Sequence, residues 1–139
     1  MFFSFLDLIR LKDWLKNFIL LLPLIFSNNI KNFDKYDDLF IAFILFCLSS
    51  SFIYIINDIK DIEIDKLHPI KKEKKPLASN KITIYFAKLF SISVFIIILI
   101  FLFINQKYFY HISLYIIINL FYTFFAKEIF LLDLFILSF

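Results

Sequence analysis

The side chains of this sequence that could do chemistry lie in one polar stretch, from Asn57 to Asn80. It reads N-D-I-K-D-I-E-I-D-K-L-H-P-I-K-K-E-K-K-P-L-A-S-N, with carboxylates gathered in its first half and lysines in its second. Clustered carboxylates bind Mg²⁺, which is commonly shared with a substrate phosphate, and lysine binds phosphate as a point charge. The stretch therefore predicts a site for a divalent cation and, through it, a phosphorylated or diphosphate donor.

The spacing of the aspartates supports this interpretation. If the preceding helix continues past Ile56, Asp61 and Asp65 lie about 60° and about 20° from Asp58 around the helix axis, so the three share one face. Glu63 points away from that face. Like charges at this spacing repel, and a bound Mg²⁺ would relieve the repulsion. The alternative is a solvated acidic helix end balanced by lysines, whereas an EF-hand is excluded by the acidic spacing and the absence of glycine.

The second half of the stretch is open to several interpretations. The His68-Pro69 pair predicts the end of a helix, because a residue before proline avoids the helical region. We interpret His68 as a hydrogen-bonding or surface residue and not as a metal ligand. The lysines from Lys71 to Lys75 can anchor the chain on one side of a membrane, bind anionic lipid heads or bind substrate phosphates, and these roles are compatible.

The elements that must position this stretch are membrane helices. The chain has 139 residues, of which 62% are hydrophobic and 22 are Phe, and its apolar residues form long blocks. This exceeds the range of soluble domains and is typical of spanning helices. The net charge of +3 gives no reason to expect a nucleic-acid partner. Charged residues interrupt the N-terminal apolar run, which argues against a secretory signal, and Cys47 is expected to be buried in a span.

The pattern predicts an all-α membrane protein with four complete spans and the start of a fifth. Residues 2–16 are expected to form one amphipathic helix along the membrane surface or leading into the first span. The predicted spans are 14–30, 39–56, 88–104 and 108–125, with a polar loop at 27–38. The last segment, 129–139, covers about 16 Å, against a hydrocarbon core of about 30 Å. We therefore expect residues 1–139 to be the N-terminal part of a single longer transmembrane domain.

The distribution of basic residues predicts the orientation of these spans. If the N-terminus is cytosolic, twelve basic residues lie inside and three outside, which is a clear positive-inside pattern. The outside set is Lys31, Lys35 and Lys107; the inside set is Arg10, Lys12, Lys16, Lys60, Lys66, Lys71, Lys72, Lys74, Lys75, Lys81, Lys88 and Lys127. The polar stretch is therefore expected in the cytosol, on a multi-pass protein of the inner (plasma) membrane.

Three segments of the chain resemble motifs of one family. The polar stretch resembles the first aspartate motif of the UbiA superfamily of intramembrane prenyltransferases, and is most similar to its decaprenyl-phosphate phosphoribosyltransferase branch. The segment R-L-K-D-W-L-K-N from Arg10 is similar to the R-x-x-x-W-x-K-N pattern of that branch, and Y-T-F-F-A-K-E-I-F-L-L-D from Tyr122 is similar to a third pattern. Two departures are Lys75 in place of an arginine and Asn80 in place of a glycine.

The resemblance implies a truncated UbiA-like helix bundle with Mg²⁺ as cofactor. It implies that Asp58, Asp61 and Asp65 are catalytic and that these three, with Asn57, bind the metal. It also implies a phosphate- or substrate-binding set, comprising Lys16, Asn17, Asn57, Lys71, Lys75 and Lys127. The donor would be phosphoribosyl pyrophosphate and the acceptor a polyprenyl phosphate lipid.

Two other functions stay open on the sequence alone. One is transfer of an isoprenyl chain from its diphosphate to an aromatic or other acceptor. The other is an inactive fragment or a non-enzymatic membrane subunit, which the short last segment favours. The sequence allows a homo-oligomer without requiring one.

Overall fold

The computed structural model describes residues 2–22, 26 and 34–129, and in that part of the chain it is built from helices with no strand. The N-terminal segment consists of α1 (Phe2–Leu8) and the 3-10 helix η1 (Leu11–Leu21), which meet at Arg10. Arg10 has a left-handed backbone, with φ 51° and ψ 48°. The single helix expected over residues 2–16 is therefore wrong: the chain breaks at Arg10 and continues in a tighter helix.

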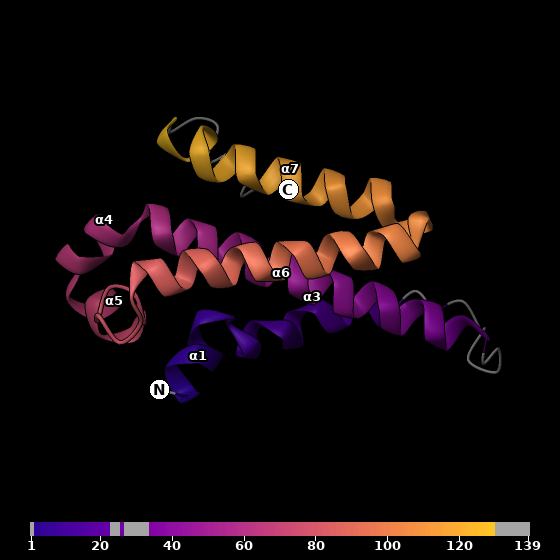
Figure 1. Ribbon diagram of the computed structural model, residues 1–139, viewed down its shortest axis with the longest axis horizontal. Coiled ribbons are helices and arrows are strands. Elements are labelled where there is room, and N and C mark those ends of the chain that lie inside the picture. The colour runs from indigo at the N-terminus through magenta and orange to yellow at the C-terminus, as the bar shows by residue number, and fades with distance from the viewer. Residues whose placement is uncertain (1, 23–25, 27–33, 130–139) are drawn as a thin grey trace.

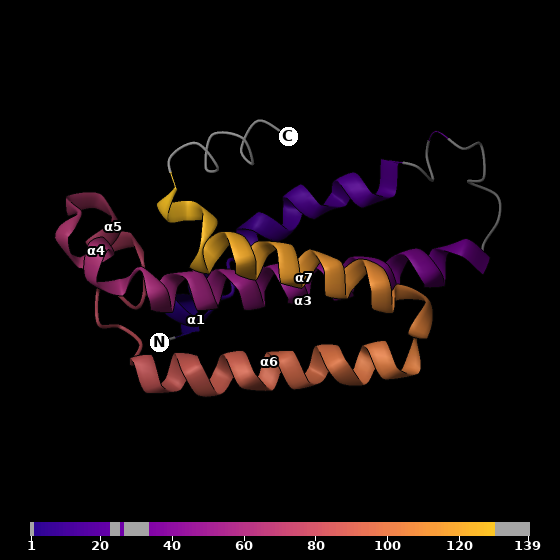
Figure 2. The ribbon, with the colours of Figure 1, turned by 90° about the horizontal axis from the view of Figure 1, so that it is seen from above.

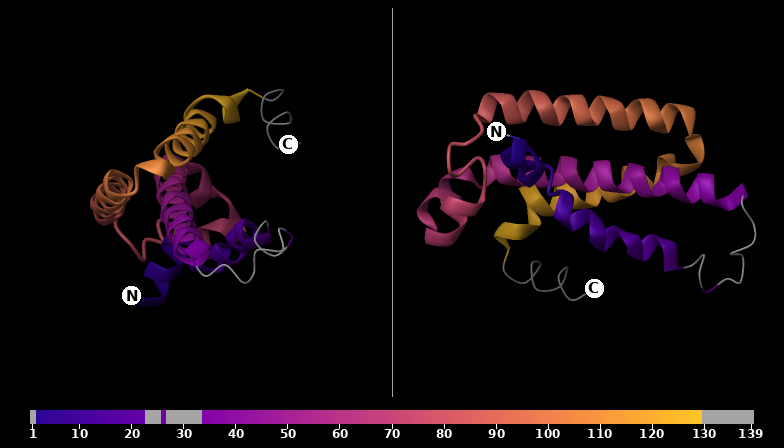
Figure 3. Two further views of the ribbon diagram at one scale, coloured as in Figure 1. Left: turned by 90° about the vertical axis from the view of Figure 1, so that its right-hand side faces the viewer. Right: turned by 90° about the horizontal axis from the view of Figure 1, so that it is seen from below.

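Helix α3 (Asp34–Lys60) is the central element of the fold. Its 27 residues extend over about 40 Å, which is enough to cross a bilayer. The stretch Tyr36–Lys60 has a mean hydropathy of 2.5. Figure 1 and Figure 3 show α1 and η1, α6 and α7 arranged around α3, and α3 contacts η1, α6 and α7.

Two short helices cap one end of α3 (Figure 1). Helix α4 (Ile62–Leu67) follows Asp61, and α5 (Pro69–Lys74) begins directly after His68. The predicted helix end at His68-Pro69 is confirmed. The His68 Nδ1 accepts hydrogen bonds from the backbone N–H groups of Ile70 and Lys71, at 3.2 and 3.4 Å, so this histidine caps α5. Asn80 then turns the chain back with φ 56°, in the geometry that a glycine would favour.

Helix α6 (Ile84–Ile104) runs along α3, and α7 (Phe109–Phe124) returns after the short 3-10 turn η2 (Gln106–Tyr108), as Figure 2 shows. The buried residues of α6 form one stripe that faces α3: Ala87, Ser91, Val94, Ile98 and Leu102. Its other sides carry exposed Leu, Ile and Phe. A helix that is apolar on every side is typical of a membrane span. A second 3-10 turn, η3 (Ala126–Glu128), follows α7.

The interior consists of two apolar clusters. The larger one joins α3, α6 and α7 through Leu45, Phe52, Ile53, Val94, Ile98, Leu102, Ile112 and Ile116. The smaller one lies at the capped end of α3 and contains Leu8, Ile55, Ile62, Leu77, Ile82 and Ala87. This second cluster fixes α1, α4 and the loop after α5 against α3, and so positions the polar stretch.

The second and third predicted spans are confirmed, and both helices are longer than expected at one or both ends. Helices α3 and α6 are long and apolar enough to cross a membrane. Helix α7 replaces the predicted span 108–125 with 16 residues, about 24 Å, slightly less than the hydrocarbon core. The first predicted span is described as η1 up to Leu21, followed by Leu22 and Phe26. Residues 23–25, most of the loop 27–38 and the segment 130–139 lie outside the described residues.

Candidate functional site

Two aspartates of the polar stretch converge on one lysine at the capped end of α3. The Lys75 Nζ donates hydrogen bonds to Asp58 Oδ1 at 2.7 Å and to Asp65 Oδ2 at 2.6 Å. The Asp58 and Asp65 side chains are only 3% and 2% exposed, and Lys75 is 18% exposed. Asp58 comes from the last turns of α3, Asp65 from α4 and Lys75 from the end of α5. The predicted shared face therefore exists for these two carboxylates.

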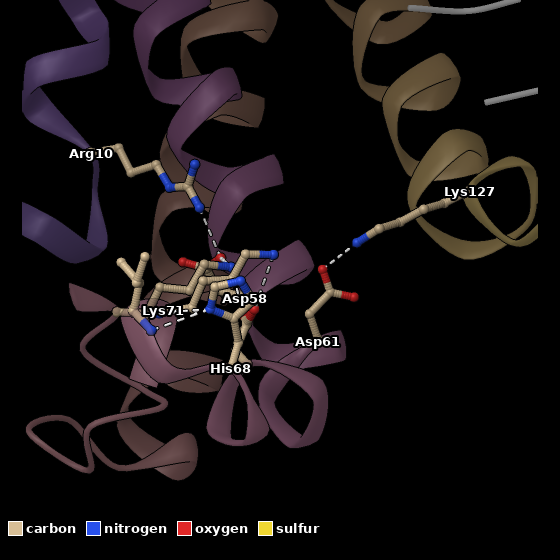
Figure 4. A network of polar contacts seen from close by, with 9 residues as sticks. Arg10, Asp58, Asp61, His68, Lys71 and Lys127 are labelled. Atoms are coloured by element: carbon tan, nitrogen blue, oxygen red, sulfur yellow. Dashed lines mark hydrogen bonds and ion pairs between the residues drawn. The ribbon is translucent and has the colours of Figure 1, made fainter. Parts of the chain in front are cut away.

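Arg10 is a second cation on the same carboxylate (Figure 4). Its Nη2 donates to Asp58 Oδ1 at 2.9 Å, and its guanidinium lies over the Tyr54 ring, 4.3 Å from the centroid. The backbone of this segment is fixed by Ser51, whose Oγ donates to the Ile9 carbonyl at 2.7 Å. The hydroxyl also accepts a hydrogen bond from Trp14 Nε1 at 2.9 Å. These contacts give the left-handed Arg10 a tertiary cause that no local sequence pattern supplies.

The electrostatics of the cluster favour a charged Lys75. Burial lowers the pKa of its ammonium, but the hydrogen bonds and the charges of Asp58 and Asp65 outweigh burial and raise the pKa above its ordinary value. Lys71 adds a weaker contact, with its Nζ 3.7 Å from Asp65 Oδ1, and is half exposed. Asp58 and Asp65 thus form a buried anionic pair that the chain neutralises with its own cations.

Asp61 is the third predicted carboxylate, and it has a different partner. It forms an ion pair with Lys127 in η3, beyond the end of α7, as Figure 4 shows. Next to it, Lys60 Nζ donates to the Thr123 carbonyl at 2.7 Å and lies 5.6 Å from the centroid of the Phe124 ring. Asp61 and Lys60 therefore join the end of α3 to the end of α7.

The other predicted site residues lie apart from this cluster or beside it. Lys16 is exposed and pairs with Asp13 at 2.7 Å. Asn17 is buried and donates to Cys47 Sγ at 3.2 Å and to Ser50 Oγ at 3.5 Å, about 12 Å along α3 from Asp58. Asn57 is half-buried beside Asp58, and its carbonyl accepts a hydrogen bond from the Asp61 N–H.

The donor set around Lys75 fits part of a magnesium site. Carboxylate oxygens are the ligands that Mg²⁺ prefers, and one or two carboxylates with several waters and substrate phosphates commonly suffice. Asp58 and Asp65 each place an oxygen within 2.7 Å of one nitrogen atom, so their carboxylates already share one cation. Among the described residues, no three His, Cys, Asp or Glu side chains are arranged to hold a metal ion. The described residues therefore supply two carboxylate ligands for a Mg²⁺ ion, Asp58 and Asp65.

A polar cavity of about 630 Å³ opens beside Asp58, between the N-terminal segment and the loop after α5. Five of its lining residues are cationic, Arg10, Lys12, Lys74, Lys75 and Lys81, and only Leu6, Leu11 and Pro76 are apolar. The acidic members are Asp7, Asp13, Asp58 and Glu73. The cationic side chains outnumber the acidic ones by one, and the volume is large enough for a small phosphorylated molecule.

Arg10 is the site residue that the sequence prediction missed. It contacts Asp58 and lines the cavity, yet it lies 48 residues away along the chain. The available signal was the position of Arg10 as the first residue of the R-x-x-x-W-x-K-N segment, whose Lys and Asn were predicted instead.

The model of the UbiA prenyltransferase family matches residues 19–139. The decaprenyl-phosphate phosphoribosyltransferase of Mycolicibacterium smegmatis is 37% identical over 76 residues, which cover 52% of this chain and 24% of that protein. The enzyme of the same name from Corynebacterium glutamicum is 39% identical over 74 residues, covering 52% of this chain and 22% of that one.

A third relative carries a different name. The nodulation protein NoeC of Azorhizobium caulinodans is 33% identical over 82 residues, which cover 59% of this chain and 26% of NoeC. The matched part of this chain thus spans about a quarter of the length of each curated relative. No solved structure gives a significant match. Since the family model covers most of the sequence and the helices have the length and apolar surface of membrane spans, the chain belongs to the UbiA prenyltransferase family of integral membrane proteins.

Proposed function

We propose that the protein acts as a Mg²⁺-dependent intramembrane transferase that moves a phosphoribosyl group from phosphoribosyl pyrophosphate to a polyprenyl phosphate. The observation that carries this proposal is the polar cavity beside Asp58, lined by five cationic side chains. The names of two relatives point in the same direction. We also propose that residues 1–139 form part of one transmembrane domain.

The character of the cavity favours a sugar phosphate over an isoprenyl donor. A phosphoribosyl donor is polar and strongly anionic throughout, which suits a cavity with charged walls. An isoprenyl diphosphate carries a long apolar chain and needs an apolar channel that begins at the carboxylates. Only three apolar residues line the cavity at Asp58, so the phosphoribosyl donor fits it better.

The residues of the cluster divide into two chemical roles. Asp58 and Asp65 would hold the Mg²⁺, with Asn57 and Asp61 as further oxygen donors from the same end of α3. A bound Mg²⁺ supplies positive charge that stabilises the diphosphate leaving group. Arg10, Lys71 and Lys75 bind and orient the phosphate groups, which is electrostatic stabilisation by groups fixed in advance.

The membrane helices supply the route for the lipid acceptor. The exposed sides of α6 and α7 are apolar, so they face acyl chains while the capped end of α3 faces water. We propose that this capped end and the N-terminus are cytosolic in the plasma membrane, because the basic residues gather there. The polyprenyl phosphate would then approach from the bilayer and the soluble donor from the cytosol.

The proposal is tested in membranes that contain the full-length protein. Labelled phosphoribosyl pyrophosphate with polyprenyl phosphate should give a labelled lipid only when Mg²⁺ is present. Asp58→Asn should lower the rate by at least about a hundredfold. Glu63→Gln is the matched control, since Glu63 is an exposed carboxylate of the same stretch that pairs with Lys66, and it should leave the rate unchanged. Transfer from a labelled isoprenyl diphosphate instead, or normal turnover by Asp58→Asn, would overturn the proposal.

A further inference from the structure

One oxygen atom of Asp58 receives two cations from different parts of the chain. Arg10 Nη2 lies 2.9 Å and Lys75 Nζ lies 2.7 Å from the same Oδ1. Lys75 also contacts Asp65, whereas Arg10 forms its ion pair with Asp58. A metal ion that binds this oxygen must replace at least one of the two cations, and Arg10 is the more exposed of them, at 27% against 18%.

The position of Arg10 gives its guanidinium a second partner to bind, an anion in the polar cavity. Its side chain lines the polar cavity together with Asp58 and four lysines, so its guanidinium is within reach of an anion that fills this space. A guanidinium binds phosphate with two parallel hydrogen bonds, which an ammonium cannot do. The Tyr54 ring beneath it supports the planar group from one side.

A short chain of contacts connects Arg10 to the single tryptophan of the protein. The Ile9 carbonyl, adjacent to Arg10, accepts from Ser51 Oγ, and Ser51 Oγ accepts from Trp14 Nε1. The left-handed backbone of Arg10 is sterically unfavourable for a residue other than glycine, and these contacts and the ion pair offset that cost. Loss of the Arg10–Asp58 ion pair is therefore expected to change the surroundings of the Trp14 indole.

We propose that Arg10 is a positioning residue that exchanges partners. Its guanidinium neutralises Asp58 while the cavity holds no anion, and it turns to the phosphate groups of the donor when a divalent cation takes its place on Asp58. Metal binding then strengthens anion binding, because it releases Arg10 from Asp58 to bind the anion. Anion binding likewise strengthens metal binding, because it draws Arg10 away from the Asp58 oxygen that the metal ion binds. This inference rests on the proposed metal site at Asp58 and Asp65, and adds that Arg10 changes partners when the metal ion binds there.

The test measures metal binding without turnover. Mn²⁺ is titrated into the purified full chain and followed by electron paramagnetic resonance. Arg10→Gln should bind Mn²⁺ about two- to fivefold more tightly than the wild type, the size expected for loss of one competing ion pair. Arg10→Lys should restore most of the wild-type affinity. Lys72→Gln removes the same charge from an exposed position outside the cavity and should change the affinity less than twofold.

Two further measurements separate exchange from a structural effect. Inorganic phosphate should tighten Mn²⁺ binding to the wild type and should do so much less in Arg10→Gln. Mg²⁺ should change the Trp14 fluorescence of the wild type but not that of Arg10→Gln. If Arg10→Gln does not fold, Tyr54→Leu loosens the same guanidinium and should tighten Mn²⁺ binding about twofold.

The outcomes distinguish this inference from the proposed function. Wild-type protein that binds no Mn²⁺ would overturn both. Wild-type protein that binds Mn²⁺ through Asp58, with Arg10→Gln binding it equally or more weakly, would overturn the exchange alone. Tighter binding by Arg10→Gln together with loss of the phosphate effect supports the exchange.

Discussion

Replacing Lys75 with methionine removes the ammonium that two buried carboxylates share. Asp58 and Asp65 are nearly inaccessible to solvent and, among the described residues, would keep Arg10 on Asp58 and the weaker Lys71 contact on Asp65 as counter-ions. Removing one partner of a buried ion pair costs about 3–5 kcal/mol. Lys75 is itself partly exposed and Arg10 remains on Asp58, so we expect a loss of about 2–3 kcal/mol in the free energy of unfolding.

Added Mg²⁺ should return part of that stability to Lys75→Met. A metal ion that binds only the folded state at ten times its Kd contributes about 1.4 kcal/mol. The wild type should gain less, because the ion must first displace the ammonium. Unfolding in mixed micelles, followed by far-UV circular dichroism with and without MgCl₂, measures both quantities. Lys72→Met is the control, with the same loss of charge at an exposed position of α5.

The difference in unfolding free energy between the wild type and Lys75→Met should change with pH in one direction. The pKa of Lys75 is raised above its ordinary value of 10.5, so its stabilisation is fully present below that value and is lost as the pH rises through the higher folded-state pKa. The difference between wild type and Lys75→Met should therefore be constant from about pH 6 to about pH 9 and shrink at higher pH. If Lys75→Met is as stable as Lys72→Met, or if Mg²⁺ restores no stability to Lys75→Met, then Lys75 does not neutralise carboxylates that can also bind a metal ion.

The remaining predictions concern the two ends of the polar stretch. In a double-mutant cycle, Asp61→Asn and Lys127→Met should show a coupling of about 0.5–1 kcal/mol in unfolding free energy, since Lys127 is partly exposed. Additive effects would contradict the α3–α7 contact. Asn80→Ala should lower the stability by about 1 kcal/mol, because φ is 56° there, and Asn80→Gly should be neutral or slightly stabilising. Equal stabilities for the two variants would show that the turn is not left-handed in solution.

The long helices and the convergence of two of the three aspartates were predictable because their causes are local. Helices α3 and α6 follow from uninterrupted apolar runs, and the convergence of Asp58 and Asp65 follows from helical phase. The phase argument assumed one continuous helix, whereas α3 ends at Lys60 and α4 starts at Ile62. The relation between the two aspartates survives this small break.

The rest of the site depends on contacts between distant residues. Asp61 was predicted to share one face with Asp58 and Asp65, yet it pairs with Lys127, 66 residues away, and no spacing rule indicates which lysine it meets. The break at Arg10 has the same origin. Residues 2–16 carry a helical pattern, and hydrogen bonds from Ser51 and an ion pair with Asp58 impose another backbone. Helix propensity is a local property and does not predict such tertiary contacts.

The sequence separations of the three ion pairs also fix when each can form during synthesis. Arg10 leaves the ribosome 48 residues before Asp58, and Lys75 follows Asp58 by 17 residues. Lys127 follows Asp61 by 66 residues, or roughly 3–13 s at ordinary elongation rates, and only after α6 and α7 have been made. If α6 and α7 both cross the bilayer as proposed, the Asp61–Lys127 pair closes only after α7 has returned to the side of Asp61. It is thus a late contact, and a chain in which only one of the helices α6 and α7 crossed the bilayer would hold Lys127 on the opposite side from Asp61 and leave this pair unformed.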